Sequence, residues 1–375
     1  MKFLKWLLSF TSRTVNIIFI VLLFVSLSAS YISPLKIWFL PFWGLLLPLF
    51  VGFNLVFVVV WILRRRYFAV VSLIAIGFCL PQLFKLCATN LGRPTKPDER
   101  VKTLKVLSYN VRDFDLYNWS DNVNSKEKIF QTIRDKNPDV ICFQEFYNDT
   151  TVEFNTVKQL QQLGYSYYFF TKELVLRGTD EWGIALFSKT PLKSYGNIVK
   201  QTFKTGYGRK PFKGLYADIQ FGDTEVRIIN VHLQSVYFGE REYETIDEFR
   251  STQNLDEHGA RSIARKLKQA FRRRAQQADE LSSFLKKQDK PIILCGDLND
   301  LPNSYASNVI SENLKDAFLN YGFGIGHTYN GKIPFLRIDR ILTSPAFIIH
   351  DFKVIHNKIS DHFPIFMECS FTKAE

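Results

Sequence analysis

Hydrophobic residues follow two different patterns along the chain. The first 90 residues contain long apolar runs that are almost free of charge, each near the roughly 20 residues that a helix needs to cross a bilayer. Three such runs lie at residues 14–35, 37–63 and 67–86. This pattern predicts a membrane anchor over residues 1–90 with about three transmembrane helices.

After the third run the apolar stretches become short. The segment "NLGRPTKPDER" at residues 90–100 combines Pro, Gly and charge, which is the composition of a linker. We place the linker at 91–102 and a folded domain at 103–375. This length is within the reach of one large α/β or α+β domain.

Within this domain, short runs rich in β-branched and aromatic residues alternate with longer polar segments of helical spacing. The predicted strands are "TLKVLSYNV", "DVICFQEF", "GIALFSK", "LYADIQF", "TEVRIINVHL", "PIILCGDLN", "RIDRILTS" and "IFMECSF". The predicted helices lie at residues 125–136, 153–163 and 260–287. Many strands and few helices indicate packed sheets that are covered by helices.

Charge narrows the choice of partner. The chain carries a net charge of +12, which favours an anionic partner such as nucleic acid or anionic lipid. A basic stretch at 261–274 falls on a predicted helix, where such a run is usually a solvated face. The five cysteines have neither zinc-site nor disulfide spacing, which argues against a disulfide-stapled module or a structural zinc domain.

The distribution of basic residues also predicts an orientation. Arg64–Arg66 lie between the second and third apolar runs, and such residues favour the cytoplasmic side. Three further basic residues precede or begin the first run: Lys2, Lys5 and Arg13. We therefore expect a multi-pass membrane protein whose folded domain lies outside the cytoplasm, on the periplasmic side. Basic residues between 85 and 100 oppose this orientation, and a cleaved signal peptide ending near "SAS" at 28–30 is the alternative for the first run.

Polar side chains end several of the predicted strands. "PIILCGDLND" closes with Asp297 and Asn299, and the period of two in a strand places both on one side. The other strand ends or following turns carry Asn110, Arg112, Glu145, His232, Asp339 and the pair Asp361–His362. Buried carboxylates are costly unless they are paired or bind a metal. Carboxylate and amide oxygens suit a hard cation such as Mg²⁺ or Mn²⁺.

In this chain order, the set resembles the endonuclease/exonuclease/phosphatase superfamily, which includes DNase I-like nucleases, inositol polyphosphate 5-phosphatases and bacterial sphingomyelinases. The resemblance covers roughly residues 103–371. It implies an α/β (α+β) fold: a four-layer sandwich of two mainly antiparallel β-sheets flanked by helices, here preceded by the transmembrane helices.

The resemblance also implies a metal site and a proton-transfer pair. Glu145 is expected to be the main ligand of Mg²⁺ or Mn²⁺, with Asn110 and Asp361 on the same side of the cation. His362 is expected to be the general base or acid, with Asp339 fixing its tautomer. A salt bridge from Asp339 to a neighbouring arginine is the structural alternative.

The remaining residues are expected to handle water and phosphate. Asp297 and Asn299 would position the attacking water and stabilise the pentacoordinate phosphorane. His232, Asn299 and Arg112 would bind the phosphate, and Glu181 would support His232. A core histidine at 232 and a surface charge at 112 are the structural alternatives.

These expectations describe a membrane-anchored hydrolase acting on phosphoester bonds, most like a nuclease. A phospholipase C- or sphingomyelinase-like enzyme or a phosphatase is the alternative, because the same site serves several substrates and the fold does not choose among them. A non-catalytic binding module is a minor alternative. The expected partners are nucleic acid or a phospholipid headgroup as substrate and membrane lipid around the N-terminal helices; no obligate protein partner is inferred.

Overall fold

The computed structural model describes residues 2–90, 101–119, 124–151, 154–198, 202–205, 208–211, 213–252 and 256–372. Most of the predicted linker at 91–102 lies outside these residues. The described chain forms two compact units. The first unit comprises Met1–Leu86, Ser235–Ala278 and Pro302–Val309, and the second comprises Cys87–Gln234, Asp279–Leu301 and Ile310–Glu375.

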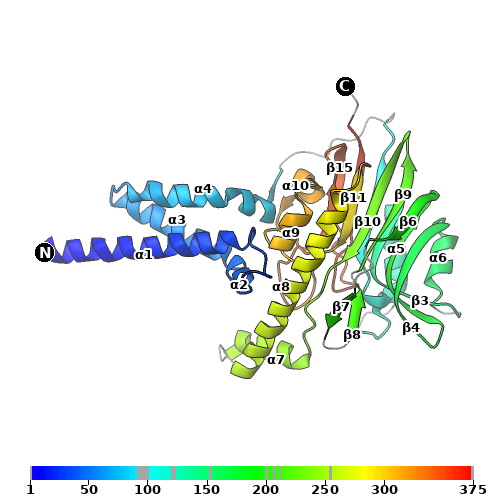
Figure 1. Ribbon diagram of the computed structural model, residues 1–375, viewed down its shortest axis with the longest axis horizontal. Helices are drawn as coiled ribbons and strands as arrows, with labels where there is room; N and C mark the ends of the chain where they lie inside the picture. Colours follow the sequence, from blue (N-terminus) through cyan, green and yellow to red (C-terminus); the bar gives the residue numbers. More distant parts are fainter. Residues whose placement is uncertain are drawn as a thin grey trace. The chain divides into compact units, whose positions relative to one another are not determined.

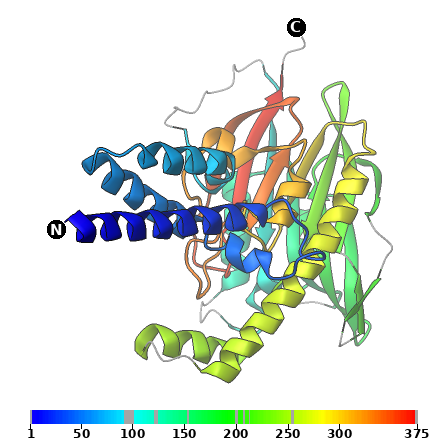
Figure 2. The same ribbon diagram turned by 60° about the vertical axis from the view of Figure 1, so that its left-hand side comes forward.

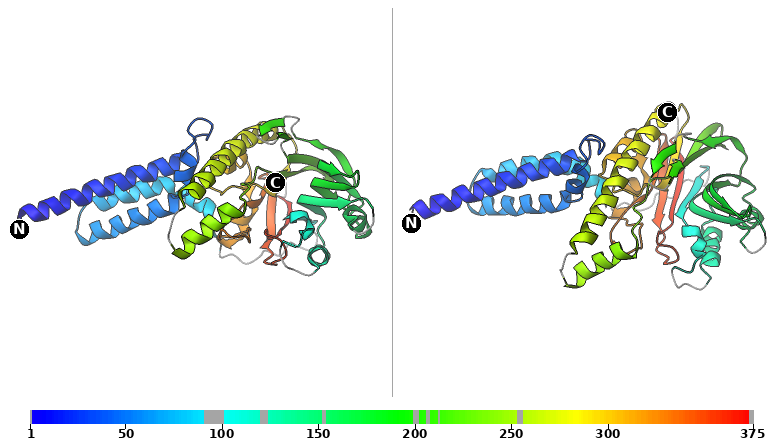
Figure 3. Two further views of the ribbon diagram at one scale, coloured as in Figure 1. Left: turned by 90° about the horizontal axis from the view of Figure 1, so that it is seen from below. Right: turned by 60° about the horizontal axis from the view of Figure 1, so that its bottom comes forward.

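The first unit is helical (Figures 1 and 3). Its apolar helices are α1 (Lys2–Ser28), α2 (Leu40–Gly44), α3 (Leu47–Leu63) and α4 (Phe68–Leu86). Later segments contribute α7 (Glu240–Thr252), α8 (Glu257–Leu285) as far as residue 278, and α9 (Tyr305–Ile310) as far as residue 309. Helices α1, α3 and α4 run side by side in both views of Figure 3.

A buried polar cluster joins these three helices. The Asn16 side-chain amide donates to the Ser72 hydroxyl at 3.0 Å, and its oxygen accepts a hydrogen bond from Trp61 Nε1 at 2.8 Å. Polar side chains of this kind bond across neighbouring apolar helices because they have no water to bond to. The cluster therefore fixes the helices to one another.

The helices agree only partly with the three predicted membrane spans. Phe10–Ser28 and Phe68–Leu86 have the length and hydropathy of a membrane span, whereas α3 is shorter, with 17 residues. The predicted span 37–63 is not one helix, because it breaks between α2 and α3, and each of these begins with a proline at its first or second position. Proline lacks the amide hydrogen that would continue a preceding helix.

The second unit contains two six-stranded sheets (Figure 2). One sheet has the order β12 (Lys315–Asp316), β14 (Asp339–Thr343), β11 (Ile292–Asp297), β10 (Thr224–His232), β9 (Lys213–Phe221), β6 (Leu192–Asn197). The other has the order β15 (Phe347–Val354), β16 (Ile365–Phe371), β2 (Leu104–Asn110), β3 (Val140–Asp149), β5 (Asp180–Ser188), β4 (Tyr167–Leu176). Only β10–β11 and β2–β3 pair in parallel among these strands. The expected pair of mainly antiparallel sheets is therefore confirmed.

Shorter elements complete the second unit. Strands β1 (Ala88–Thr89) and β13 (Phe323–Gly324) form one two-stranded sheet, and β7 (Thr202–Thr205) and β8 (Gly208–Pro211) form another. The remaining helical elements are η1 (Arg112–Asp115), α5 (Ser125–Lys136), α6 (Thr156–Gln162) and α10 (Ala317–Tyr321).

Strands of the second unit bury both of their faces. In β3, Val140 and Cys142 pack between the two sheets, whereas Ile141 and Phe143 pack under α5 and α6. On the outer face of the other sheet, Tyr216 of β9 meets Phe284 of α8 with ring centroids 5.6 Å apart. Strands covered on both faces have nearly continuous apolar sequences. This explains why the sequence predicted these runs as strands. Two sheets flanked by helices are therefore present, as expected from the resemblance.

All eight predicted strands are present, and the predicted helices correspond to α5, α6 and α8. Helix α6 begins at Thr156 rather than at residue 153, which lies outside the described residues. The sequence did not predict β4, β6, β15 or α7. Strands β4 and β6 are at sheet edges, where most of their side chains are half-buried or exposed and the apolar pattern is weak.

Candidate active site

The polar strand ends of both sheets meet in the second unit. Asn110 ends β2, His232 ends β10 and Asp297 ends β11, while Asp339 begins β14. In the ladder, Asp297 lies opposite both His232 and Asp339. All four side chains are buried. The structure therefore brings these predicted residues together from sequence positions far apart.

Two backbone features set the direction of the site side chains. Gly296 precedes Asp297, and a Cβ at this glycine would lie 2.0 Å from the carbonyl oxygen of Val231, so the close approach of β10 and β11 requires glycine. Glu145 lies at a register shift between Phe143 and Phe146 with φ of 49°. An irregularity of this kind turns a side chain out of the regular alternation of a strand.

The carboxylate of Asp297 is the centre of the site. Its Oδ2 accepts hydrogen bonds from the side-chain amides of Asn110 at 3.1 Å and Asn299 at 3.0 Å. The same oxygen lies 3.6 Å from His232 Nε2 and 3.7 Å from His362 Nε2. Burial raises the pKa of Asp297 to about 7, with a contribution from Asp339, although His362, the Asn299 backbone amide and the Asn110 side chain act in the opposite direction. The group can therefore exchange a proton near neutral pH.

His362 and Asp339 form a buried pair. His362 Nδ1 lies 2.9 Å from Asp339 Oδ2, so the imidazole directs Nε2 towards Asp297. Burial alone would lower the pKa of His362, but Asp339 and Asp297 together raise it well above its ordinary value. A histidine held in this way keeps a proton to donate.

Three residues that the sequence did not single out position this pair. The hydroxyl of Thr328 accepts a hydrogen bond from the Asp339 amide at 3.0 Å, and the hydroxyl of Ser360 accepts one from the His362 amide at 3.2 Å. The Tyr329 ring meets the His362 ring edge-on, with centroids 5.2 Å apart. Ser360 directly precedes the Asp361–His362 pair in the sequence. This position is the one sequence signal that could have identified any of the three residues.

The predicted metal ligands lie around this centre. Glu145 Oε1 is 3.7 Å from His232 Nε2, and its side chain is 34% exposed. Asn110 Oδ1 accepts a hydrogen bond from the Arg112 amide at 3.1 Å. Asp361 Oδ2 lies 3.5 Å from Arg112 Nε. These carboxylate and amide oxygens have the chemistry that Mg²⁺ and Mn²⁺ prefer.

Geometry also singles out another group of possible ligands. Among the described residues, Asp297, Asp339 and His362 have ligand atoms within 4.8 Å of one another. This group differs from the predicted set of Glu145, Asn110 and Asp361. Within this group, Asp339 already binds Nδ1 of His362, so the imidazole is engaged by a carboxylate.

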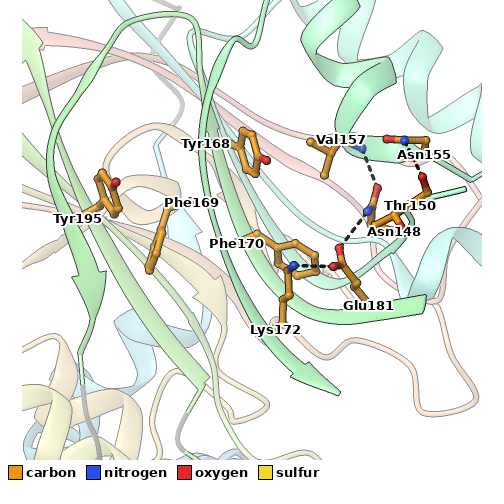
Figure 4. A pocket seen from close by; sticks show the side chains of 10 residues that line it. All are labelled: Asn148, Thr150, Asn155, Val157, Tyr168, Phe169, Phe170, Lys172, Glu181 and Tyr195. Atoms are coloured by element: carbon orange, nitrogen blue, oxygen red, sulfur yellow. Dashed lines mark hydrogen bonds and ion pairs between the residues drawn. The ribbon is translucent and has the colours of Figure 1, made fainter. Parts of the chain in front are cut away.

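Glu181 lies in a pocket on β4 and β5 (Figure 4). Its carboxylate binds the Lys172 ammonium and accepts a hydrogen bond from Asn148 at 3.0 Å. The pocket has a volume of about 450 Å³, and aromatic residues such as Tyr168 and Tyr195 also line it. Beside His232, the described carboxylates are Glu145 and Asp297. The contacts of the Glu181 carboxylate are with Lys172 and Asn148 rather than with His232.

Comparisons with known proteins show the family of most of the chain. A model of the Endonuclease/Exonuclease/phosphatase family matches residues 107–362, and a model of a domain of unknown function matches residues 5–86. A search of curated proteins finds no match.

The search of solved structures finds similar chains at low sequence identity. An endonuclease/exonuclease/phosphatase from Beutenbergia cavernae DSM 12333 has 18% identity and a TM-score of 0.50, with 72% of each chain covered. The human Nocturnin catalytic domain with bound sulfate has 17% identity and a TM-score of 0.49, covering 72% of this chain and 95% of that one. A family protein from Bacteroides thetaiotaomicron has 16% identity and a TM-score of 0.49, covering 74% and 98%.

Proposed function

Because the chain belongs to the endonuclease/exonuclease/phosphatase family of phosphoester hydrolases, we propose that it is a membrane-anchored, divalent-metal-dependent phosphodiesterase of nuclease-like specificity. The observation that carries this proposal is the contact of Asp297 Oδ2 with two histidines and two amides. The net charge of +12 favours a polyanionic substrate.

The side chains divide the chemistry between them. Asp297, with its pKa raised to about 7 by burial, accepts the proton of the attacking water, and Asn299 holds that water in position. His362, oriented by Asp339 at 2.9 Å, transfers a proton at Nε2. Two neighbouring groups whose pKa values are shifted by their surroundings are typical of acid–base catalysis.

The phosphate is bound by groups at the edge of this centre. His232 and Asn299 face the reacting phosphoryl group, and Arg112 contributes a guanidinium that is paired with Asp361. Glu145, Asn110 and Asp361 would hold the cation, whose chemistry would be to neutralise charge on the phosphoryl oxygens. We assign no catalytic step to Glu181, because its carboxylate is engaged by Lys172 and Asn148.

A Glu145→Gln variant is expected to need a higher Mg²⁺ concentration for half-maximal activity, by roughly tenfold or more, because an amide is a weaker ligand than a carboxylate. Direct calorimetry with Mn²⁺ should show the same loss of affinity without any substrate. Glu225→Gln is the matched control, since Glu225 pairs with Lys290 on the surface. Unchanged metal titrations in Glu145→Gln would place the cation elsewhere.

The apolar helices support the membrane part of the proposal. At one end of the helical bundle, Arg64 donates to the Ser12 hydroxyl at 3.1 Å, and the Arg13 guanidinium lies over the Phe68 ring at 5.3 Å. Arg13 of the first helix and Arg64 of the following basic loop therefore share one end of the bundle, which we assign to the cytoplasm. With three crossings, as we propose, the domain at 103–375 would lie on the periplasmic side.

Reporter fusions test this topology. Alkaline phosphatase fused after Glu375 is expected to be active, and a fluorescent protein that folds only in the cytoplasm is expected to be dark there. Fusions after Arg66 serve as the control and should give the reverse pattern. Bright fluorescence after Glu375 would contradict three crossings and make intracellular nucleic acids or nucleotides the leading substrates.

A phospholipase C-like activity or a phosphatase activity is the second candidate. The two helices with the length and hydropathy of a membrane span favour the phospholipase C-like activity, because they would hold the domain near lipid headgroups. Sphingomyelin hydrolysis in the absence of nuclease activity would support this second candidate. Binding of either substrate without hydrolysis would favour a non-catalytic module.

A further inference from the structure

A left-handed turn follows directly after the site strand β2. The residues Arg112, Asp113, Phe114 and Asp115 have φ values of 45°, 54°, 56° and 58°. Non-glycine residues avoid this conformation, because the Cβ atom approaches the following carbonyl oxygen. Four successive residues of this kind persist only where the surroundings hold them firmly, and such segments gather at functional sites.

Buried contacts hold this turn in place. The Phe114 ring is buried and packs against Phe143 and Phe146, with ring centroids 6.0 and 5.5 Å away. The carboxylate of Asp115, also buried, accepts a hydrogen bond from the Ser125 hydroxyl at 2.9 Å. Burial of two consecutive side chains, Phe114 and Asp115, and the hydrogen bond to Asp115 therefore offset the cost of the turn.

The turn directs an unusual group of side chains to the surface beside the site. Arg112 Nε lies 3.5 Å from Asp361 Oδ2, and the Arg112 guanidinium lies over the Trp119 ring at 4.8 Å. The Tyr117 ring meets the Trp119 ring with centroids 4.8 Å apart. Trp119 is nevertheless 47% exposed and Tyr117 is 56% exposed. Arg112 thus links an open aromatic surface to a predicted metal ligand.

We propose that Arg112, Tyr117 and Trp119 form a binding site for a nucleobase that is attached to the phosphodiester undergoing hydrolysis. This inference rests on the proposed function and names its substrate class as a nucleotidyl ester. A flat base stacks on an exposed indole or phenol ring whatever its identity, and a guanidinium stacks on a base or binds a phosphate.

The same arrangement disfavours a choline headgroup. Quaternary ammonium groups bind to the open faces of aromatic rings through cation–π attraction. Here the Arg112 cation already lies over the Trp119 ring, and a second positive charge beside it would be repelled. An aliphatic headgroup has no flat surface to stack on the rings. A planar nucleobase fits both the exposed rings and the neighbouring positive charge.

Two esters with the same leaving group test the site in the full-length chain in detergent micelles. In thymidine 5′-(p-nitrophenyl phosphate), the base stays on the phosphate-containing product after p-nitrophenolate leaves. Methyl p-nitrophenyl phosphate has no base. Trp119→Ala is expected to lower kcat/KM for the thymidine ester roughly tenfold to a hundredfold and to change the methyl ester less than twofold. Tyr195→Ala is the control, because Tyr195 is an exposed tyrosine of the pocket on β4 and β5.

The outcomes separate this site from the proposed activity. An equal fall for both esters, or no fall for either, would overturn base stacking at Trp119. Calorimetry with thymidine 5′-monophosphate provides a reading that needs no turnover. If wild-type protein hydrolyses neither ester but binds this nucleotide in a Trp119-dependent manner, the hydrolytic proposal fails and the base site stands. Equal binding by wild type and Trp119→Ala, or no binding by either, would overturn the base site.

Discussion

Replacing His362 with alanine is expected to lower kcat by about 10²–10⁴-fold, the usual contribution of one acid–base group. The imidazole is buried, is bonded through Nδ1 to Asp339 at 2.9 Å, and directs Nε2 to within 3.7 Å of Asp297. Both atoms that a proton transfer needs are therefore fixed before substrate arrives. Steady-state hydrolysis of bis-p-nitrophenyl phosphate by the full-length protein measures the effect.

A matched histidine separates chemistry from folding. His350 is also buried, but its Nε2 lies 2.8 Å from the Ser370 hydroxyl on neighbouring strands, and we expect His350→Ala to keep kcat within a few-fold. Asp339→Asn should also lower kcat, because a neutral amide does not hold the charged imidazole as the carboxylate does. Wild-type turnover in folded His362→Ala protein would remove His362 from the mechanism.

Replacing Asp316 with alanine is expected to destabilise the second unit by about 3–5 kcal/mol, the usual cost of leaving buried charges without their partner. Asp316 Oδ2 accepts hydrogen bonds from Arg337 at 2.6 Å and from Arg340 at 3.0 Å. All three side chains are almost fully buried. These arginines flank Asp339 in sequence, so the same ion pairs hold the strand that carries the histidine's partner.

Chemical denaturation followed by circular dichroism measures this loss in the full-length chain. Asp289→Ala is the control, since Asp289 is exposed and surface substitutions usually change stability by less than about 0.5 kcal/mol. A double variant Asp316→Leu/Arg340→Met should recover part of the stability if unpaired charge is the cause. An Asp316→Ala protein as stable as wild type would show that the arginines find other partners or water.

The core strands and the centre of the site were predictable for one physical reason. Strands such as β3 and β11 bury both faces, so their sequences are nearly continuous apolar runs that end abruptly in polar residues. Parallel pairing of β10 with β11 and antiparallel pairing of β11 with β14 then align His232, Asp297 and Asp339 at one edge. The polar strand ends, together with the resemblance of their chain order to the superfamily, therefore sufficed to group residues that lie far apart along the chain.

Features that depend on tertiary contacts were not predictable. Glu181 faces Asn148 across the β3–β5 ladder, a register that the sequence does not specify. Arg112 to Asp115 include no glycine that would indicate a left-handed turn; the turn is explained by tertiary contacts, which are the packing of Phe114 and the hydrogen bond from Ser125 to Asp115. Pro41 and Pro48 are a sequence signal for the break in the predicted span 37–63. The long uncharged run nevertheless led to the prediction of a single span.

One measurement tests the central claim most directly: hydrolysis by the full-length protein in detergent, with Mg²⁺ and with a chelator, of plasmid DNA, RNA, bis-p-nitrophenyl phosphate and sphingomyelin. We predict Mg²⁺-dependent cleavage of a nucleic acid and of the model diester, abolished by the chelator and lost in His362→Ala. Absence of hydrolysis of every substrate, or equal rates for wild type and His362→Ala, would contradict a metal-dependent phosphodiesterase at this site.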